Sequence, residues 1–342
     1  MRLQCPLGAQ GSFGKGLPAI LSRERLSGGS RPGRFTGDDI RQKESEKAVV
    51  GTVAGMADPE QGFPHLKEID MPELPEVETV ANGVCARIRG DRIEDVWFSS
   101  KKEPMKSPPA EMALALAGRT IARVRRVGKH IVFDFEPLAG HEPVQWIVHL
   151  GMTGRLLVAQ PQVPRPAHTH GVLILQSGRE LRFVDARRFG RMGLHRDTAG
   201  FAGPGHEPLN IPQTTFRELF RGRRTPIKAA LLNQSLLHGV GNIYADESLF
   251  RAGIRPRRMA GRLTAAELQR LHAALQKVLR EAIRLGGSSV SDYVDAEGER
   301  GFFQLRHRVY MRTGQPCLVC ATPIRRLVVG GRSTHYCPAC QQ

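Results

Sequence analysis

The sequence predicts a multidomain α+β protein: a helix and a β-rich domain, then a helical domain, then a small metal-bound segment. Three observations lead to this prediction. Short segments between residues 93 and 185 alternate in period two, the stretch from 214 to 287 has helical periodicity, and four cysteines lie within the last 26 residues. At 342 residues, the chain is long enough for two or three domains with cores of their own.

An amphipathic helix is expected directly after Met71. Its apolar residues are three or four positions apart and therefore share one face; they are Leu74, Val77, Val80, Val84 and Ile88. Pro75 suits the first turn of such a helix, and Gly90 is suited to end it.

Seven extended segments follow this helix, and several of them alternate apolar and polar residues. They are 93–98, 120–127, 130–135, 144–150, 154–158, 171–176 and 181–185. The dipeptide Ser177-Gly178 between the last two is typical of a hairpin turn. Together these segments predict a β-sandwich with a helix before it.

The helical stretch contains four candidate helices, at 216–221, 226–233, 243–252 and 265–285. Gly239 and Gly241 form a tight turn before the third of them, which exposes N–H groups at the positive end of the helix dipole. Such an arrangement binds phosphate. Simple helix packing is the alternative, and the basic residues nearby favour phosphate; they are Arg221, Arg223, Arg224 and Lys228.

Composition suggests where the domains begin and end. We predict a β-sandwich domain over 71–199, a Pro- and Gly-bearing linker over 200–213, a helical domain over 214–301 and a metal-bound segment over 302–342. Residues 1–70 carry 11 glycines and little apolar periodicity. We expect them to be a disordered extension, or sequence upstream of a wrongly assigned start.

The charge of the chain points to a polyanionic partner. There are 50 basic and 33 acidic residues, giving a net charge of +17. Residues 1–70 hold only 10 of the basic and 9 of the acidic residues. The excess therefore belongs to the predicted folded part, where it favours nucleic-acid binding; the alternative is a role in solubility. No run of about 18 apolar residues occurs, so we expect no membrane span.

Four cysteines are spaced as two pairs, in the pattern Cys-x2-Cys-x16-Cys-x2-Cys. Two thiolate pairs at this spacing are typical of a single tetrahedral Zn²⁺ site. The alternative is two disulfides in a secreted domain, but no export signal precedes the chain's folded part. The predicted zinc ligands are Cys317, Cys320, Cys337 and Cys340.

One string at the start of the predicted folded part has two interpretations. The string Met71-Pro-Glu-Leu-Pro-Glu-Val-Glu-Thr79 taken alone is a helix-start signal, with Pro and acids in the first turn. It also resembles very closely the amino terminus of the formamidopyrimidine-DNA glycosylases. The resemblance recurs, in the family's order, at residues 149–154, 185–190 and 239–250 and at the four-cysteine finger. It covers essentially all of residues 71–342.

This resemblance implies a bifunctional DNA glycosylase and AP lyase of base excision repair that removes oxidised purines, chiefly 8-oxoguanine and formamidopyrimidines. In the family, methionine is removed and the proline amine attacks C1′ of the damaged nucleotide, which would make Pro72 the nucleophile. Glu73 would transfer protons to and from the deoxyribose, and Lys129 would contact phosphate and donate a proton during elimination. Arg332 in the finger would hold a phosphate and assist δ-elimination.

The resemblance also assigns DNA contacts. A base inside a duplex must be flipped out, and the void is filled in the family by a trio that matches Met152, Arg187 and Phe189. His168 matches a DNA-contact position, although the sequence does not distinguish it from His170. In the helical domain, which resembles the family's helix–two-turn–helix domain, the matching phosphate contacts are Arg223, Lys228 and Asn242.

The implied partner is double-stranded DNA with oxidised bases or abasic sites, and the implied protein is a monomer of the cytoplasm, associated with the nucleoid. The zinc would be structural. Because an amide nitrogen is not nucleophilic, the mechanism requires a free amine on Pro72, and we expect the working protein to start there. The alternatives are an endonuclease VIII-like glycosylase for oxidised pyrimidines, and a non-catalytic DNA binder if residues 1–70 are retained.

Overall fold

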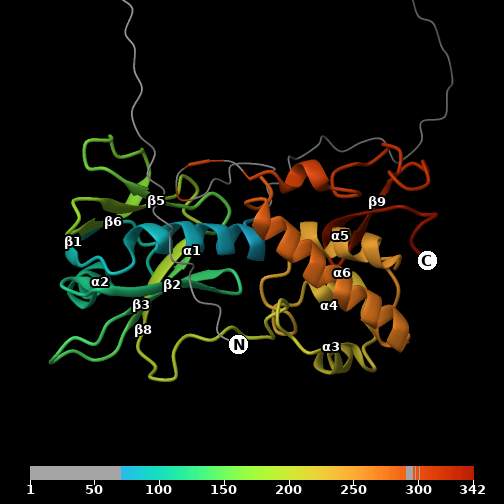
Figure 1. Cartoon of the computed structure of the whole chain (residues 1–342), viewed down its shortest axis with the longest axis horizontal. Helices are drawn as coiled ribbons and strands as arrows, with labels where there is room; N and C mark the ends of the chain where they lie inside the picture. The colour runs from blue at the N-terminus through green and yellow to red at the C-terminus, as the bar shows by residue number, and fades with distance from the viewer. Residues whose placement is uncertain (1–70, 290–295, 297, 300) are drawn as a thin grey trace, which may run out of the picture. The chain divides into compact units, whose positions relative to one another are not determined.

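The computed structural model describes residues 71–289, 296, 298, 299 and 301–342 (Figure 1). Residues 1–70, and residues 290–295, 297 and 300 at the end of the predicted helical domain, therefore lie outside the described residues. The described residues belong to one compact unit. They form a mixed helix and strand fold, which confirms the predicted α+β class.

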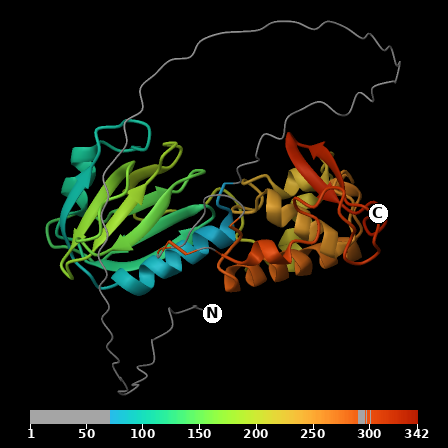
Figure 2. The same ribbon diagram turned by 90° about the horizontal axis from the view of Figure 1, so that it is seen from above.

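A helix and two antiparallel sheets make up the first part of the fold (Figures 1 and 2). The helix is α1 (Leu74–Ile88). One sheet has the order β1 (Ile93–Phe98), β6 (Thr169–Leu175), β7 (Glu180–Val184), β5 (Arg155–Ala159). The other has the order β2 (Ile121–Val127), β3 (His130–Phe135), β4 (Gln145–His149), β8 (Arg191–His195). The predicted sandwich is thus present.

The core of this sandwich includes the apolar face predicted for α1. Val77, Val80, Val84 and Ile88 are buried in a cluster with residues of both sheets, such as Trp146. Helix α1 contacts β2 and β3 of one sheet and β5 of the other. Burial of a helix stripe between two sheets accounts for the three- and four-residue spacing in the sequence.

Four helices form the second part, close to the predicted positions. They are α3 (Gln213–Phe220), α4 (Ile227–Leu231), α5 (Asn242–Ala252) and α6 (Ala265–Arg284), with short 3₁₀ turns η1 (Ala260–Arg262) and η2 (Phe303–Arg306). Helix α6 begins at a capping box, in which the Glu267 N–H donates to Thr264 Oγ1 at 3.2 Å and the Thr264 N–H donates to the Glu267 carboxylate at 2.8 Å. Among the described residues, no helix has the length and apolarity to cross a bilayer.

One helix, one strand of the sandwich and one hairpin were not predicted. Helix α2 (Pro109–Leu116) has only two buried residues, so its sequence carries little periodicity. Strand β8 has Gly193 at its centre, which interrupts the alternation. A hairpin of β9 (Arg325–Val329) and β10 (Arg332–Tyr336) separates the two cysteine pairs.

The start of α1 is built into the helical part. Leu74 lies in the hydrophobic cluster of α3 to α6, and its N–H donates to the Gly239 carbonyl at 3.0 Å. Gly239 has φ +93°, and a Cβ there would lie 2.9 Å from Leu74 Cβ. Glycine is therefore required at this position both for its backbone conformation and for the close approach.

Buried His307 makes stability depend on pH. Its Nε2 lies 3.1 Å from Ser288 Oγ, and burial lowers the pKa of His307 to about 4. An unfolded histidine has a pKa of about 6.5, so between these values the unfolded chain binds more protons. The free energy of unfolding should therefore fall as pH falls from about 6.5 to 4, with up to about 3 kcal/mol from this residue.

We predict that His307→Gln makes urea-unfolding stability fall less steeply than in the parent chain between pH 7 and 4. His141→Gln, at an exposed histidine, is the matched control. Identical slopes for the parent and both variants would show that His307 is not the group responsible.

Candidate active site and DNA-binding surface

A cavity of about 510 Å³ brings together residues from all three parts of the described fold. Its lining includes Glu73 before α1, Lys129 from the β2–β3 turn, Asn242 at the start of α5 and Arg332 at the start of β10. Four of the predicted site residues therefore share one cavity, although up to 259 positions separate them in the sequence.

Glu73 is buried and its carboxylate lies at the amino terminus of α5. Oε1 accepts from the Ile243 N–H at 3.0 Å, and Oε2 accepts from the Tyr244 N–H at 3.5 Å. Gly241 makes this possible, because a Cβ on that residue would overlap the Glu73 carboxylate. The positive end of the helix dipole stabilises the negative charge of this buried group.

This arrangement limits the interpretation of Gly239 and Gly241 as a phosphate-binding turn. At the start of α5, the N–H groups of Ile243 and Tyr244 donate to the carboxylate of Glu73 from the same chain. These two donors are therefore taken, while Val240, Gly241 and Asn242 line the cavity, so the phosphate contact of this turn stays a prediction.

Glu76, which was not among the predicted site residues, holds the backbone of Glu73 in place. Its carboxylate is buried and accepts from the Glu73 N–H at 2.9 Å, the Ser288 N–H at 2.7 Å and the Tyr244 hydroxyl at 2.5 Å. Burial raises the pKa of Glu76, while these hydrogen bonds act in the opposite direction. The acids of the opening motif therefore have distinct surroundings: Glu73 lines the cavity, whereas Glu76 ties together α1, α5 and the end of α6.

Pro72 is buried between Met71 and Glu73, both of which line the cavity. Lys129 enters the cavity from a two-residue turn, since Val127 and His130 are paired across β2 and β3. Gly128 in this turn has φ +60°, and a Cβ there would lie 2.7 Å from His238 Nδ1. The tight turn fixes the backbone of Lys129 at the tip of the hairpin.

His149, a further lining residue, lies beside Lys129. Burial, with the neighbouring cations, lowers the pKa of His149 to about 4. Its Nδ1 accepts from the Gly151 N–H at 3.0 Å. A neutral ring in this tautomer leaves Nε2 as the protonated nitrogen, so His149 adds a hydrogen-bond donor without adding a charge.

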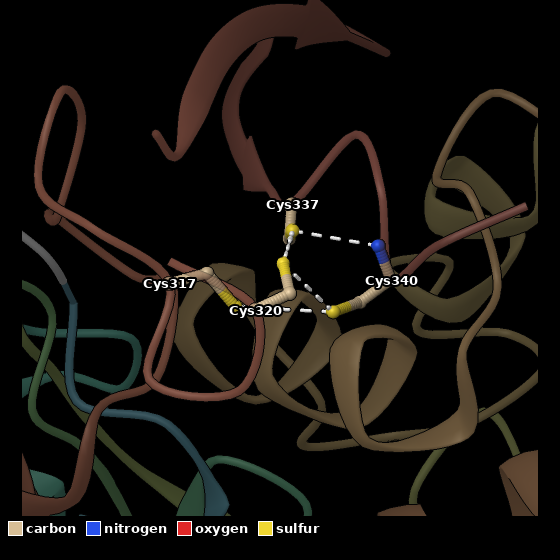
Figure 3. Close-up of side chains that lie close together, drawn as sticks. All are labelled: Cys317, Cys320, Cys337 and Cys340. Atoms are coloured by element: carbon tan, nitrogen blue, oxygen red, sulfur yellow. Dashed lines mark hydrogen bonds between the residues drawn. The ribbon is translucent and has the colours of Figure 1, made fainter. Parts of the chain in front are cut away.

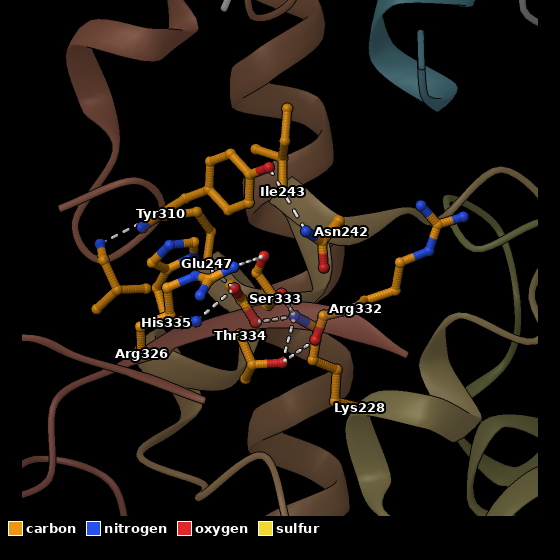
Figure 4. A network of polar contacts seen from close by, with 12 residues as sticks. Lys228, Asn242, Ile243, Glu247, Tyr310, Arg326, Arg332, Ser333, Thr334 and His335 are labelled. Atoms are coloured by element: carbon orange, nitrogen blue, oxygen red, sulfur yellow. Dashed lines mark hydrogen bonds and ion pairs between the residues drawn. The ribbon is translucent and has the colours of Figure 1, made fainter. Parts of the chain in front are cut away.

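Arg332 is exposed and lines the cavity from the first position of β10. The two-residue turn of Gly330 and Gly331, with φ values of +58° and +74°, presents it there. Figure 4 shows its guanidinium directed away from the polar network behind the hairpin. This placement leaves the side chain available to an anion in the cavity.

The structure contradicts the prediction that Lys228 contacts DNA phosphate. Lys228 is fully buried, and its Nζ lies 2.7 Å from Asp246 Oδ1, an ion pair between α4 and α5. Nζ also donates to the Ser333 carbonyl at 2.6 Å and to Thr334 Oγ1 at 2.9 Å (Figure 4). Lys228 therefore anchors the hairpin that carries Arg332.

The four predicted zinc ligands come together at the end of the chain (Figure 3). Their sulfur atoms all lie within 4.8 Å of one another, with Cys320 and Cys337 at 3.4 Å and Cys317 and Cys340 at 3.9 Å. Four thiolates on one tetrahedral zinc would be about 3.8 Å apart. The cluster therefore fits one Zn²⁺ with every ligand position filled, which defines a structural site.

Two loops bring the predicted void-filling trio to one place. Asp185 is fully buried and accepts from Thr153 Oγ1 at 2.5 Å and from the Gly190 N–H at 2.7 Å, so it joins the loop of Met152 to the loop of Arg187 and Phe189. Sequence reasoning overlooked Asp185 and Thr153, although both lie within the quoted motifs.

The two side chains of the second loop are presented to solvent. Arg187 is exposed and its guanidinium stacks over the ring of Phe189, with 4.8 Å between Cζ and the ring centroid. Phe189 is itself 46% exposed, so the stacked pair is accessible to a partner.

The structure separates the two histidines that the sequence left equivalent. His170 is buried, and both ring nitrogens have partners at 3.1 Å: Nδ1 with Ser99 Oγ and Nε2 with the Asp185 carbonyl. His168 is exposed and adopts φ +64°. Of the two, His168 is the one available to DNA.

Among the expected contacts of the helical part, Arg223 is exposed and its Nε donates to the Leu219 carbonyl. Asn242 lines the cavity, and its Nδ2 lies 3.5 Å from the Tyr310 hydroxyl. Asn242 Oδ1 is buried without a hydrogen-bond partner among the described residues. A buried polar atom of this kind is suited to a ligand in the cavity.

Comparison with known proteins places this combination of fold and site among DNA glycosylases. Residues 71–192 match the formamidopyrimidine-DNA glycosylase N-terminal domain, and residues 204–294 match the H2TH domain of the same proteins. Residues 314–342 match the zinc finger found in FPG and IleRS. The chain belongs to the formamidopyrimidine-DNA glycosylase family.

Individual relatives agree with this assignment. The formamidopyrimidine-DNA glycosylase of Solibacter usitatus is 47% identical over 273 residues, which are 80% of this chain and 100% of that protein. The crystal structure of MutM (Fpg) from Thermus thermophilus is 41% identical with a TM-score of 0.69, covering 79% of this chain and 98% of that one. A Lactococcus lactis Fpg mutant bound to Fapy-dG DNA is 33% identical with a TM-score of 0.71, covering 79% and 100%.

We predict that Lys228→Met destabilises the protein by roughly 3–5 kcal/mol, because it leaves the Asp246 carboxylate buried without its cation. Adding Asp246→Leu should recover part of the loss. Urea unfolding measures both effects, with Lys277→Met at an exposed position as the control. Unchanged stability together with weaker DNA binding would restore the phosphate-contact interpretation.

Zinc removal should unfold the finger, because a segment this small has little core of its own. We expect one zinc per chain by native mass spectrometry. Chelation should give parallel losses of finger structure and DNA binding, both recovered when zinc is added back. Inactivation with the β9–β10 hairpin still folded would contradict a purely structural metal.

Proposed function

We propose that this chain is a bifunctional DNA glycosylase and AP lyase that excises oxidised purines, chiefly 8-oxoguanine and formamidopyrimidines, from double-stranded DNA. The observation that carries the proposal is the cavity in which Glu73, Lys129 and Arg332 meet beside Pro72. Family membership supports the same chemistry. The protein would act as a monomer in the cytoplasm, on DNA of the nucleoid.

In the proposed reaction, the amine of Pro72 attacks C1′, and the bond from C1′ to the damaged base breaks with its electron pair leaving on the base, which takes a proton from water. The Glu73 carboxylate accepts the proton that the proline nitrogen loses and returns it to the deoxyribose ring oxygen as the ring opens, leaving an iminium ion on the proline nitrogen. A secondary amine gives an iminium with no N–H to lose, which makes it a lasting electron sink. Removal of a C2′ proton then expels the 3′ phosphate, and a second elimination expels the 5′ phosphate.

The charged residues of the cavity would act on the phosphates. Lys129 would contact the backbone at the scission site and donate a proton in elimination, and Arg332 would stabilise the phosphate that leaves in δ-elimination. The zinc would supply folding of the finger and no chemical step. Pro72 must be the amino-terminal residue for this mechanism, because its nitrogen is otherwise a tertiary amide.

Recognition would use residues around the cavity, together with Asn242 on its wall. Met152 and Phe189 would fill the space left by the flipped nucleotide, while Arg187 would hydrogen-bond the orphan base. His168, Arg223 and Asn242 would contact phosphates. Lys228 is not part of this proposal, since its amine is buried behind the hairpin.

The first test is excision of 8-oxoguanine from a duplex by Glu73→Gln. We expect a loss of about a hundredfold or more, as for removal of a general acid, with some cleavage of preformed abasic sites retained. Glu111→Gln, at an exposed acid on α2, is the matched control. Equal losses on the two substrates would contradict the assigned role of Glu73.

Substrate choice and the covalent step separate the proposal from its rivals. Faster release of thymine glycol than of 8-oxoguanine would indicate an endonuclease VIII-like enzyme for oxidised pyrimidines instead. Borohydride should trap a covalent adduct with lesion DNA, and mass spectrometry of the peptide should locate it on an amino-terminal Pro72. Absence of any adduct from protein that begins at Pro72 would leave only a DNA binder.

A further inference from the structure

A second groove, of about 820 Å³, lies along α6 and shares no lining residue with the cavity described above. We call it the α6 groove. Its walls are one stripe of α6 and the segment around η2. Six cationic side chains line it: Arg251, Arg270, Lys277, Arg284, Arg306 and Arg308.

The groove has a strong positive charge. Glu281 is the one carboxylate among its lining residues, and it is engaged by Arg251 at 2.6 Å. The other five cations are exposed. Like charges gathered around a concavity repel one another and attract anions, and low-dielectric walls focus the field.

The floor of the groove is apolar. Ala273 and Ala274 on α6 and Leu285 at its end lie between the cations. The two alanines leave an open space, and the long arginine and lysine side chains form its borders. A ligand that fits both features has negative charges along its edges and an apolar side chain that reaches the floor.

The α6 groove lies away from the proposed DNA site. Helix α5 packs against α6 on one side and against β10 on the other. Figure 2 shows the orange α6 and the red β9–β10 hairpin on opposite sides of α5. A ligand in the groove therefore does not compete for Arg332 or for the cavity that it lines.

We propose that the α6 groove docks an acidic peptide segment of a partner protein, one that carries an apolar side chain among its carboxylates. A DNA duplex presents its phosphates to the cations but has no apolar side chain to place on Ala273, Ala274 and Leu285. A single strand is held mainly by stacking of its bases on aromatic rings, and none of the described residues that line the groove is aromatic. The groove would let the protein hold a partner while its cavity is occupied.

The probe is a short fluorescein-labelled peptide of aspartates around one phenylalanine, added to the full chain without DNA. Fluorescence anisotropy should show saturable binding that weakens as salt is raised. Lys277→Glu combined with Arg284→Glu should weaken it at least about tenfold. Arg89→Glu combined with Arg217→Glu makes the same change in net charge at exposed sites elsewhere and should leave binding within about twofold.

Two further measurements test the floor and guard against misfolding. Ala273→Trp adds no charge but fills the groove. It should lower the affinity for the peptide as strongly as the charge reversals do. Replacing the phenylalanine of the peptide by alanine should weaken binding to the parent chain. Duplex cleavage should be unchanged in Lys277→Glu/Arg284→Glu, which also shows that this variant is folded.

Three results would overturn the proposal. Absence of peptide binding at low salt would remove the site. Equal weakening in the two charge-reversed variants would show attraction to net charge alone. If an oligothymidylate binds with the same dependence on Lys277 and Arg284 and the peptide does not, the groove belongs to a polynucleotide.

Discussion

The hydrogen bonding of the Glu73 carboxylate to the first turn of α5 is the interaction on which the rest of the structure depends. It joins the residue before α1 to the helical part, and Gly239 and Gly241 leave the space that this close approach needs. Because Leu74 is also part of the helical core, the segment that carries Pro72 is fixed between the two larger parts of the fold. This matters for the amino-terminal nucleophile proposed above, because residues at a chain terminus are otherwise among the most mobile.

Two hairpins then bring cations to this fixed point. Lys129 lies in the two-residue β2–β3 turn, and Arg332 follows the two-residue β9–β10 turn as the first residue of β10. The paired strands on both sides of each turn thereby fix the backbone of both cations. The second hairpin is secured from behind by Lys228 and from its base by the thiolate cluster, so one buried cation and one metal site position a single exposed arginine.

Sequence reasoning predicted the elements whose pattern is local. A window of a few residues is enough to show the apolar spacing of α1 and α6. The same is true of the seven predicted strands of the sandwich, several of which alternate apolar and polar residues. Helix α2 and strand β8 were missed because little burial or a central glycine weakens that local pattern.

The site was predicted where a residue type and a family motif agree, and mispredicted where a partner is remote. Lys228 stands in a run of basic residues and looks like its neighbours, but its partners are Asp246 and a hairpin 105 positions away. The carboxylate at the first turn of α5 was likewise not predicted, because Glu73 lies 170 positions before Ile243. Asp185 was overlooked for the same reason, because its partner Thr153 belongs to a different motif from its own.

If Met152 and Phe189 enter the duplex as proposed above, the hydrogen bonds of Asp185 have a consequence for the search along undamaged DNA. Asp185 joins the two loops that carry these side chains, so little backbone conformational entropy would be lost when they enter a base step. The cost of each trial insertion would then fall largely on the duplex, where unstacking is easier at damaged steps than at intact ones. Differences in DNA deformability would thus become differences in the time that the protein stays at each step.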